Sequence, residues 1–337
     1  MNGAIDSEHG SRATKPVDSL EMPPIRIGLA GAGRWASAVH ANLLSAHPAV
    51  RFTGVWSRTL ESANRLAEEY GVAAYPTLDA LIEVSEAIVI AVPPAAQPEI
   101  AAQTVGAGRH VMLEKPLAPT LDEARRLCAA IERAGVGSVM ALTFRFTSGV
   151  QKMISDCVGQ IPDSAHCAFV VPASPAEGGW RSNGGPLLDL GPHVVDLLDA
   201  AIGPVRAIYA ATTNSGVSMA LHHGSVTSHA TLDYTRHNRF AFVVNLVMRG
   251  QPIDFEPPLE MRGFYYQGSS QSPAPPSSYG PFVALLQEFV DACRGRSSHL
   301  GARRGLEIQA VLDAASQSVA SGCVVAINRD LAIGSLK

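Results

Sequence analysis

The stretch LAGAGRWASA, Leu29–Ala38, decides the fold of this chain. It overlaps the end of a short apolar run, Ile25–Ala30, which predicts a buried strand. It leads into Trp35–Ala46, whose apolar residues recur at helical spacing. A glycine cluster between a strand and a helix is the context that a dinucleotide-binding loop requires, whereas the same letters elsewhere would indicate little.

Three small residues of this loop fit a phosphate-binding turn. Gly31 permits a tight turn, Gly33 lets the backbone approach a pyrophosphate, and Ala36 allows the helix to pack closely on the strand. The helix start at Arg34 and Trp35 presents free N–H groups to the phosphate charge. The alternative is a plain turn before an alanine-rich helix, but the strand-to-helix context favours the nucleotide site.

The composition indicates a chain with room for two cores and without a strong charge. The 337 residues exceed one ordinary domain, 47% of them are hydrophobic, and 17% are charged with a formal net charge of -4. This balance argues against a nucleic-acid binder, which carries a basic patch. No apolar run reaches the length of a membrane span, so we expect no membrane partner.

The cysteines and the polar start of the chain favour a cytoplasmic protein. The five cysteines form no C-x-x-C pair, which favours reduced, mostly buried thiols over a disulfide framework or a zinc site. They are Cys128, Cys157, Cys167, Cys293 and Cys323. Residues 1–22 are polar, lack the apolar segment of a secretory signal, and predict a disordered tail. Met22, just before the first strand, is an alternative start.

Strands and helices alternate over residues 23–143. After the glycine loop, apolar strands are expected at Arg51–Ser57, Glu86–Val92, Arg109–Leu113 and Val136–Leu142. Helices are expected between them, at Thr59–Gly71, Leu78–Val84, 95–108 and Thr120–Gly135. This alternation predicts a parallel sheet with crossover helices, which is an α/β domain.

From about Thr143 the pattern changes. Helices are expected near 149–158 and 193–203, β-rich stretches over 165–173, 205–214, 224–234 and 238–250, and a helix pair at 281–295 and 303–322. The strands resemble an antiparallel meander. The pattern therefore predicts a second, α+β domain over residues 144–337.

The end of the second strand bears on the choice of cofactor. An acidic residue there would bind the ribose 2′-hydroxyl of NAD. The chain instead has Ser57 and Arg58, a hydroxyl and a guanidinium that suit the 2′-phosphate of NADP. We therefore favour NADP over NAD. The alternative is that Arg58 is a solvated turn residue, or stacks on the adenine without choosing a cofactor.

Two further motifs carry candidate chemistry. Glu114, Lys115 and Pro116 follow a predicted strand, at the edge where open α/β sheets bind ligands. Lys115 is placed there to hold a substrate oxygen beside a nicotinamide, although a lone lysine is more often a surface residue. Asp189 and His193 are four residues apart, which on a helix places them on one face, where the carboxylate can orient the imidazole.

Other acidic and histidine residues are expected to be structural. Asp196, three residues after His193, competes as its partner but fits a structural role on the helix better. His222, His223 and His229 suggest a metal site, yet they alternate along expected strands with no acidic or thiol ligand close in sequence. Exposed sheet histidines are favoured, so we expect no metal.

Five motifs follow one another from about Pro24 to Leu198. They are GLAGAGRWA, WSR, AVPPAAQPE, GRHVMLEKPLA and GGPLLDLGPHVVDLL. Each is loose alone, but together, in this order and spacing, they resemble the glucose–fructose oxidoreductase / inositol dehydrogenase / rhizopine-catabolism (Gfo/Idh/MocA) family. The resemblance implies an N-terminal Rossmann domain with a doubly wound parallel sheet. It also implies a C-terminal α+β domain whose large, open, mostly antiparallel sheet joins copies into a homodimer or homotetramer.

The resemblance also implies an activity. Members transfer hydride between NAD(P) and a hydroxyl or carbonyl carbon of sugars, cyclitols and related small molecules, without a metal. The family's lysine falls on Lys115, and its aspartate and histidine fall on Asp189 and His193. His193 would take the hydroxyl proton, Lys115 would hold and polarise the oxygen, and Asp189 would position the substrate or tune His193. Pro116 would follow a cis bond that aims Lys115 into the cleft.

The motifs match the family unevenly. Val92 and Pro93 resemble the strand end beside the nicotinamide. Gln97 stands near a place where relatives often carry a histidine, which puts a secondary cofactor contact in question. Pro162 replaces the last glycine of a G-x-I-G turn, so that loop is expected to differ.

Trp180 and Arg181 resemble a substrate-side position of the family. The indole would stack on a sugar face and the guanidinium would hold a hydroxyl or an anionic group, with a surface-loop anchor as the alternative. Two other functions stay open: a catalytically idle cofactor-binding sensor or scaffold, and a reductase for a nucleotide-linked keto-sugar, a dihydrodiol or an imine. The retention of Lys115, Asp189 and His193 favours an enzyme.

Overall fold

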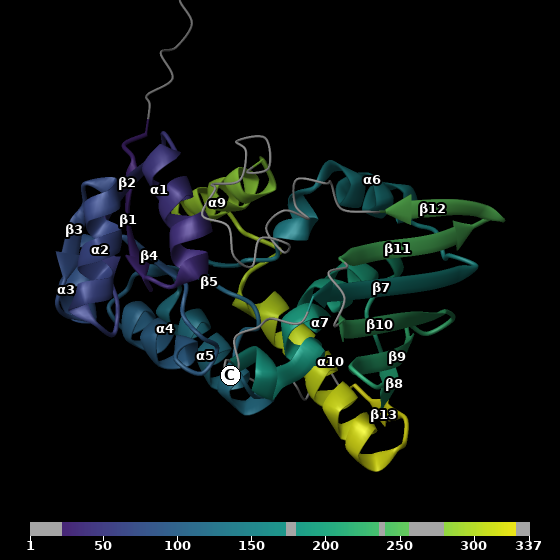
Figure 1. Ribbon diagram of the computed structural model, residues 1–337. Helices are drawn as coiled ribbons and strands as arrows, with labels where there is room; N and C mark the ends of the chain where they lie inside the picture. Colours follow the sequence, from purple (N-terminus) through teal and green to yellow (C-terminus); the bar gives the residue numbers. More distant parts are fainter. Residues whose placement is uncertain (1–21, 173–179, 236–239, 256–279, 328–337) are drawn as a thin grey trace, which may run out of the picture.

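The computed structural model describes residues 22–172, 180–235, 240–255 and 280–327. Of the predicted tail, only Met22 lies within these ranges, and it is exposed. The described residues form two parts that lie side by side, each built around one sheet, with helices α7 and α10 between them (Figure 1). Within these ranges, no helix combines the length and the apolar composition that a bilayer crossing requires.

The first sheet is parallel throughout and confirms the predicted Rossmann topology. Its strand order is β3-β2-β1-β4-β5-β6, so the order reverses between β1 and β4, where such sheets bind their ligands. The strands are β1 (Ile25–Ala30), β2 (Val50–Trp56), β3 (Ala73–Tyr75), β4 (Ala87–Ile90), β5 (His110–Leu113) and β6 (Ser138–Met140). Strand β3 was not expected, because its three residues are exposed or half-buried and form no apolar run.

The helices of the first part follow the expected ranges. They are η1 (Ala36–Ala41), α1 (Asn42–Ala46), α2 (Leu60–Tyr70), α3 (Leu78–Val84), α4 (Gln97–Gly106) and α5 (Leu121–Ala134). Helices α2 and α5 end at Gly71 and Gly135, whose φ angles of 63° and 64° are left-handed. The expected helix over Trp35–Ala46 has a π-helical turn, η1, at its centre, which apolar spacing does not reveal.

The second sheet is mixed rather than a pure antiparallel meander. Its order is β12-β11-β7-β10-β9-β8-β13, and every neighbouring pair is antiparallel except β7–β10. The strands are β7 (Ser164–Pro172), β8 (Ala207–Thr212), β9 (Gly216–His222), β10 (Thr227–Thr235), β11 (Ala241–Met248), β12 (Gln251–Phe255) and β13 (Val325–Ala326). The meander prediction was wrong for β7, because the long helix after β7 lets that strand enter the middle of the sheet.

The helices of the second part also contact the first. They are η2 (Thr143–Phe146), α6 (Ser148–Cys157), α7 (Trp180–Ile202), α9 (Gly280–Cys293) and α10 (Ala302–Ser321). Helix α9 packs against η2 and β6, and α10 packs against α5 as well as β8. Gly185, with a φ of 60° inside α7, kinks the helix just before the predicted Asp189–His193 face. Helices α9 and α10 therefore hold the two sheets together around α7.

A buried ion-pair network fixes α7 to α10 and η2. The guanidinium of Arg304 donates to Asp196 and Asp199, at 2.8 Å each, and Arg145 lies 3.6 Å from Asp196. Burial raises the pKa of Asp196, and the two arginines oppose that rise. Asp196, considered above as a partner of His193, is thus paired with Arg304 and Arg145.

We expect Arg304→Ala to lower the free energy of unfolding by about 3–5 kcal/mol, because it leaves Asp196 buried without its main partner. Urea denaturation followed by circular dichroism measures the loss. The matched control is Arg65→Ala, which removes the exposed ion pair with Glu61 on α2 and should change stability little. Equal losses in the two variants would contradict the structural role of the network.

Candidate functional site

The glycine loop is held tightly against the neighbouring strands. Gly31 has a φ of 127°, and a Cβ built on it would lie 2.2 Å from the carbonyl oxygen of Ala91. Its N–H donates to the carbonyl oxygen of Trp56 at 2.7 Å. A side chain at position 31 would therefore clash with the end of β4, and only glycine fits there.

The next glycine faces open space. A Cβ built on Gly33 would meet no protein atom within 4 Å, and both Gly33 and Arg34 are exposed. Ala36 is fully buried where the helix meets the sheet. An open backbone at a helix start, with the helix packed closely behind it, fits a pyrophosphate group. The residues present therefore fit the dinucleotide that the sequence predicts.

The other predicted cofactor residues lie at the same edge of the sheet. Residues 57–58 and 114–115 directly follow β2 and β5, and residues 92–93 come one residue after β4. The carboxyl ends of these strands meet at one edge because the strands are parallel (Figure 1). Arg58 and Pro93 are exposed there, whereas Ser57 and Val92 are half-buried. The predicted cofactor residues therefore gather at one edge of the first sheet.

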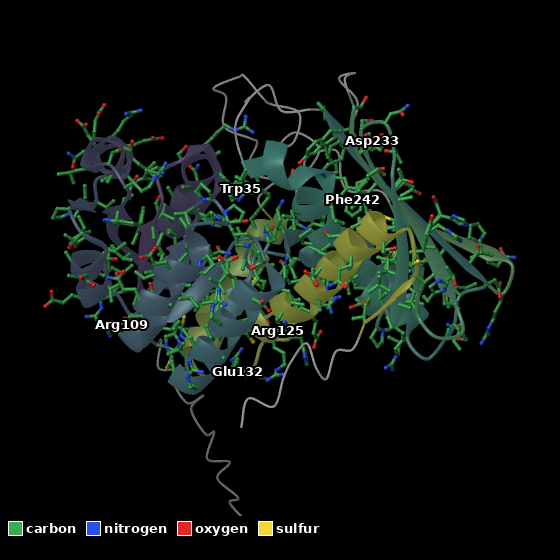
Figure 2. All side chains as sticks on the ribbon, turned by 90° about the horizontal axis from the view of Figure 1, so that it is seen from below. Trp35, Arg109, Arg125, Glu132, Asp233 and Phe242 are labelled. Carbon is green, nitrogen blue, oxygen red and sulfur yellow. The ribbon has the colours of Figure 1, made fainter. Side chains whose placement is uncertain are left out.

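Trp35 does not face the solvent side of the loop. Its indole N–H donates to Glu114 at 2.7 Å, and its ring packs edge-on against Phe282 of α9, with centroids 6.0 Å apart. Figure 2 shows Trp35 on its helix beside α9. Among the predicted cofactor residues, Trp35 and Glu114 thus contact each other.

Gln97 binds the backbone on both sides of Lys115. Its side chain is buried, and its amide N–H groups donate to the carbonyl oxygens of Glu114, Pro116 and Leu117 at 2.7–3.1 Å. Its own carbonyl accepts the N–H of Glu114 at 2.8 Å. Gln97 therefore holds the backbone around Lys115, a role that a single sequence position on a helix does not indicate.

Lys115 is mostly buried and is not a surface residue. Its ammonium Nζ donates to both the backbone oxygen and the carboxylate Oδ1 of Asp189, at 2.7 Å each. The bond between Lys115 and Pro116 is cis, as the family resemblance implies. The segment after β5 and helix α7 therefore meet at the Lys115–Asp189 ion pair.

Asp189 is the centre of the cluster. Its Oδ2 accepts hydrogen bonds from Arg181 Nε and the Tyr234 hydroxyl, both at 3.1 Å. Burial alone would raise the pKa of Asp189, but the charges of Lys115 and Arg181 hold it at about 2. The carboxylate is therefore ionised at neutral pH. Burial, followed by the charge of Asp189, raises the pKa of Tyr234.

His193 lies beside this ion pair in an apolar setting. It is buried, its ring packs edge-on against Phe144 with centroids 4.9 Å apart, and Phe169 lies behind it. Within the described ranges, neither ring nitrogen has a hydrogen-bond partner. Burial, then the charge of Lys115, lowers the pKa of His193 well below 6.5, while Asp189 acts in the opposite direction. His193 is therefore neutral at pH 7 and able to accept a proton.

Trp180 and Arg181 border the same cluster. The Arg181 guanidinium lies 4.6 Å from the centroid of the Trp180 ring, and Lys115 Nζ lies 5.9 Å from it. Arg181 is partly exposed while its Nε contacts Asp189. The structure thus brings together all five residues that the sequence placed at the substrate side.

Sequence reasoning missed Tyr234 and His40. Tyr234 comes from β10, 45 residues after Asp189, and no motif surrounds it. His40 lies within the helical segment after the glycine loop and contacts Glu114. The available sequence signal for His40 was a histidine in the alanine-rich stretch that follows the glycine loop.

The remaining candidates lie elsewhere. His222 contacts Thr227, His223 contacts Gly203 and Ser228, and His229 stacks on His166. In the part of the chain that the structure describes, no cluster of three or more metal-ligating side chains occurs. All five cysteines are free thiols. Pro162 is buried in the connection between α6 and β7.

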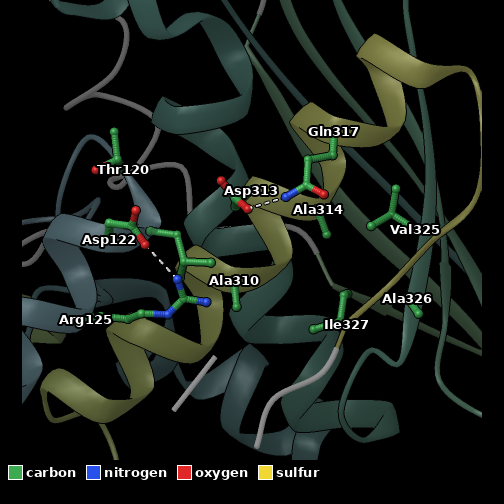
Figure 3. A pocket seen from close by; sticks show the side chains of 11 residues that line it. Thr120, Asp122, Arg125, Ala310, Asp313, Ala314, Gln317, Val325, Ala326 and Ile327 are labelled. Atoms are coloured by element: carbon green, nitrogen blue, oxygen red, sulfur yellow. Dashed lines mark hydrogen bonds and ion pairs between the residues drawn. The ribbon is translucent and has the colours of Figure 1, made fainter. Parts of the chain in front are cut away.

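A pocket of about 360 Å³ opens between α5, α10 and β13, and none of the predicted site residues lines it (Figure 3). Its polar side chains bind one another: Arg125 pairs with Asp122 at 2.7 Å, and Gln317 donates to Asp313 at 2.6 Å. The pocket is therefore separate from the Lys115 cluster.

The chain is similar to known oxidoreductases. Residues 25–141 match the model of the GFO_IDH_MocA family, described as an oxidoreductase family with an NAD-binding Rossmann fold. Glucose-6-phosphate 3-dehydrogenase of Bacillus subtilis is 30% identical over 184 residues, which is 51% of this chain and 52% of that protein. D-glucoside 3-dehydrogenase of Escherichia coli is 29% identical over 198 residues, 55% of this chain and 56% of that protein.

A third relative is a dTDP-3,4-didehydro-2,6-dideoxy-alpha-D-glucose 3-reductase of Streptomyces violaceoruber. It is 34% identical over 190 residues, 53% of this chain and 55% of that protein. The chain thus spans about half the length of the curated relatives it matches.

Two solved structures show the same fold over nearly the whole chain. GenD2 from gentamicin A biosynthesis, in complex with NAD, has a TM-score of 0.80 at 22% identity and covers 94% of this chain and 99% of that one. Levoglucosan dehydrogenase, in complex with NADH, has a TM-score of 0.78 at 20% identity and covers 90% and 99%. They confirm the predicted fold class.

We expect His193 to titrate well below pH 6.5, and its pKa to move in opposite directions in two variants. Lys115→Met removes the positive charge that lowers it and should raise it, whereas Asp189→Asn removes the negative charge and should lower it further. NMR of ¹³C-labelled imidazoles measures each titration. A His193 titration near pH 6.5, or one that neither variant moves, would contradict the geometry.

Proposed function

We propose that this chain is an oxidoreductase of the Gfo/Idh/MocA family, whose model residues 25–141 match, and that it transfers hydride between a nicotinamide dinucleotide and C3 of a glucose-derived ring. The observation that carries the proposal is the cluster of Lys115, Asp189 and neutral His193 beside the strand ends that fit the dinucleotide. The dinucleotide, when bound, supplies the hydride acceptor or donor.

The relatives support both the substrate class and the position on the ring. Two of them are named as 3-dehydrogenases of a glucose phosphate or a glucoside, and the third as a 3-reductase of a glucose-derived keto-sugar. The names share position 3 and differ in direction. A site with one proton acceptor and one hydrogen-bond donor serves both directions, because the same groups return the proton in the reverse reaction.

Among the described residues, Lys115 uses two of its three N–H bonds, which leaves one for the substrate. An ammonium group has three N–H donors, and two of them point to Asp189. The third can donate to the reacting oxygen, which stabilises the negative charge that develops on it as the proton leaves. The ionised Asp189 keeps the ammonium in this orientation.

His193 handles the proton. Its ring is neutral at pH 7, and its nitrogens are not engaged by the described residues, so it can accept the proton of a sugar hydroxyl. The packing of Phe144 against the ring excludes water from that side. Trp180 offers a flat surface to the apolar face of a sugar, and Arg181 offers an N–H to a hydroxyl or an anionic substituent.

The experiment that tests the proposal offers NAD and NADP in turn with glucose-derived sugars, glucosides, sugar phosphates, their 3-keto forms and cyclitols. Reduced nicotinamide is followed by absorbance, and the product is identified by NMR. We expect turnover with a glucose-derived ring and a 3-keto product. Oxidation at another carbon, or turnover of cyclitols alone, would contradict the proposal.

We expect Lys115→Ala to lower turnover at least ~100-fold with unchanged affinity for the dinucleotide, since the lost N–H acts on the reacting oxygen. Steady-state kinetics and fluorescence titration of the cofactor measure the two quantities. Lys152→Ala is the matched control, because Lys152 pairs with Asp156 on the surface of α6. Near-normal turnover of Lys115→Ala would contradict the assignment of Lys115 as the donor to the reacting oxygen.

NADP is the proposed cofactor because Ser57 and exposed Arg58 follow β2, where a 2′-phosphate would lie. We expect Arg58→Ala to weaken NADP binding ~10-fold and NAD binding much less, the size of one hydrogen bond to a charged group. Calorimetric titration with each cofactor measures this. Arg51→Ala, at the opposite end of β2, is the control. Equal losses for both cofactors would remove the basis for the preference.

A further inference from the structure

A buried carboxylate next to Lys115 has no role in the mechanism above. Glu114 has a mostly buried side chain, and its Oε1 lies 2.7 Å from both the indole Nε1 of Trp35 and the imidazole Nε2 of His40. Its Oε2 lies 3.3 Å from the backbone N–H of Lys115. One carboxylate thus connects the helix after the glycine loop to the residue that carries the lysine.

The π-helical turn η1 makes this double contact possible. Trp35 and His40 are five residues apart, which in an α-helix places them about 140° apart around the axis, on nearly opposite sides. A π-helix closes its hydrogen bonds from i to i+5, so residues five apart come to the same side. The structure has this turn at Ala36–Ala41, and both side chains reach the same oxygen of Glu114.

The protonation of the contact follows from its chemistry. Burial by itself raises the pKa of Glu114, but hydrogen bonding and charge from His40, followed by Lys115 and Trp35, bring the pKa below its ordinary value. An ionised carboxylate only accepts hydrogen bonds, so Nε2 of His40 carries the proton of this contact. The titratable groups that face Glu114 are His40 from η1 and Lys115 from its own segment; α4 contributes the uncharged amide of Gln97.

We propose that His40 is a positioning residue for Lys115. It acts through Glu114, and the π-helical turn that carries it makes the glycine loop and the lysine-bearing segment one rigid unit. The side chain of Gln97, on α4, binds backbone groups of the same segment. In the described part of the chain, the His40 imidazole makes its ion pair with Glu114 and none with Asp189, so its effect on the reaction is indirect.

His40→Ala should lower kcat ~10- to 100-fold, the cost of a small misplacement of the lysine. We expect KM and the dinucleotide affinity to change little. Since the buried Glu114 then loses one of its hydrogen-bond donors, its pKa should rise, and the acid limb of the kcat profile should move to higher pH. His40→Gln has an amide N–H that can donate to Glu114. This variant should restore most of kcat and return the acid limb of the kcat profile to its wild-type pH. His47→Ala, a second buried histidine just after the same helix, is the matched control.

The kinetic readout rests on the proposed function, so a second readout is independent of turnover. NMR of ¹³C-labelled carboxylates follows the titration of Glu114, and the indole N–H signal of Trp35 reports its hydrogen bond. We expect both to shift in His40→Ala and to stay near wild type in His40→Gln. If these shifts occur but the protein has no activity on sugars, the proposed function is refuted and the inference about His40 stands.

Three results would overturn the inference. The first is an unchanged Glu114 titration in His40→Ala. The second is an equal loss of kcat in His40→Ala and His40→Gln with an unmoved acid limb, which indicates damage to packing. The third is the same loss in His47→Ala.

Discussion

The ion pair between Lys115 and Asp189 is the contact on which the candidate site depends. It joins the segment after β5 of the first sheet to α7, which packs on the second sheet, with two contacts of 2.7 Å. Both side chains are mostly buried, so loss of the Asp189 carboxylate would leave the Lys115 ammonium without its ion-pair partner at a cost of about 3–5 kcal/mol. The same contact therefore sets the position of the two sheets at the site and the direction of the ammonium.

The charges around this ion pair give Asp189 and His193 different chemical roles. Asp189 accepts hydrogen bonds from Lys115, Arg181 and the Tyr234 hydroxyl. These donors hold its pKa at about 2 and keep it from serving as a base at neutral pH. His193, one helical turn further along α7, faces Phe144 and stays neutral. Two residues four apart on one helix thus differ in charge. The cations around Asp189 stabilise its carboxylate, whereas burial and the charge of Lys115 disfavour the protonated form of His193.

Local patterns were enough to predict the parts of the molecule that are local in sequence. The strand–glycine–helix motif predicted the first sheet and the tight turn at Gly31, which the packing of Ala91 explains. The structure also brings Lys115, Asp189 and His193 together, although their catalytic roles stay predictions. Short or half-exposed strands such as β3 gave no periodic signal, and β9 and β12 were also missed.

Apart from the meeting of Lys115 with Asp189 and His193, which the family resemblance implied, the following contacts between distant segments were not predicted. Tyr234 reaches Asp189 only because β10 lies in the middle of the second sheet, beside β7, which enters it in parallel. Gln97 looked like a departure from a family pattern, yet its amide fits four backbone groups around Lys115. The π-helical turn depends on backbone hydrogen bonding that side-chain periodicity does not encode.

The most direct test of the central claim follows one atom. A glucose-derived substrate labelled with deuterium at C3 would be oxidised by the purified protein, and the reduced dinucleotide would be examined by NMR and mass spectrometry. We expect the deuterium at C4 of the nicotinamide, on a single face of the ring, with a primary isotope effect on the single-turnover rate. Recovery of the deuterium in water, or its retention in the sugar while the dinucleotide is reduced, would contradict hydride transfer from C3.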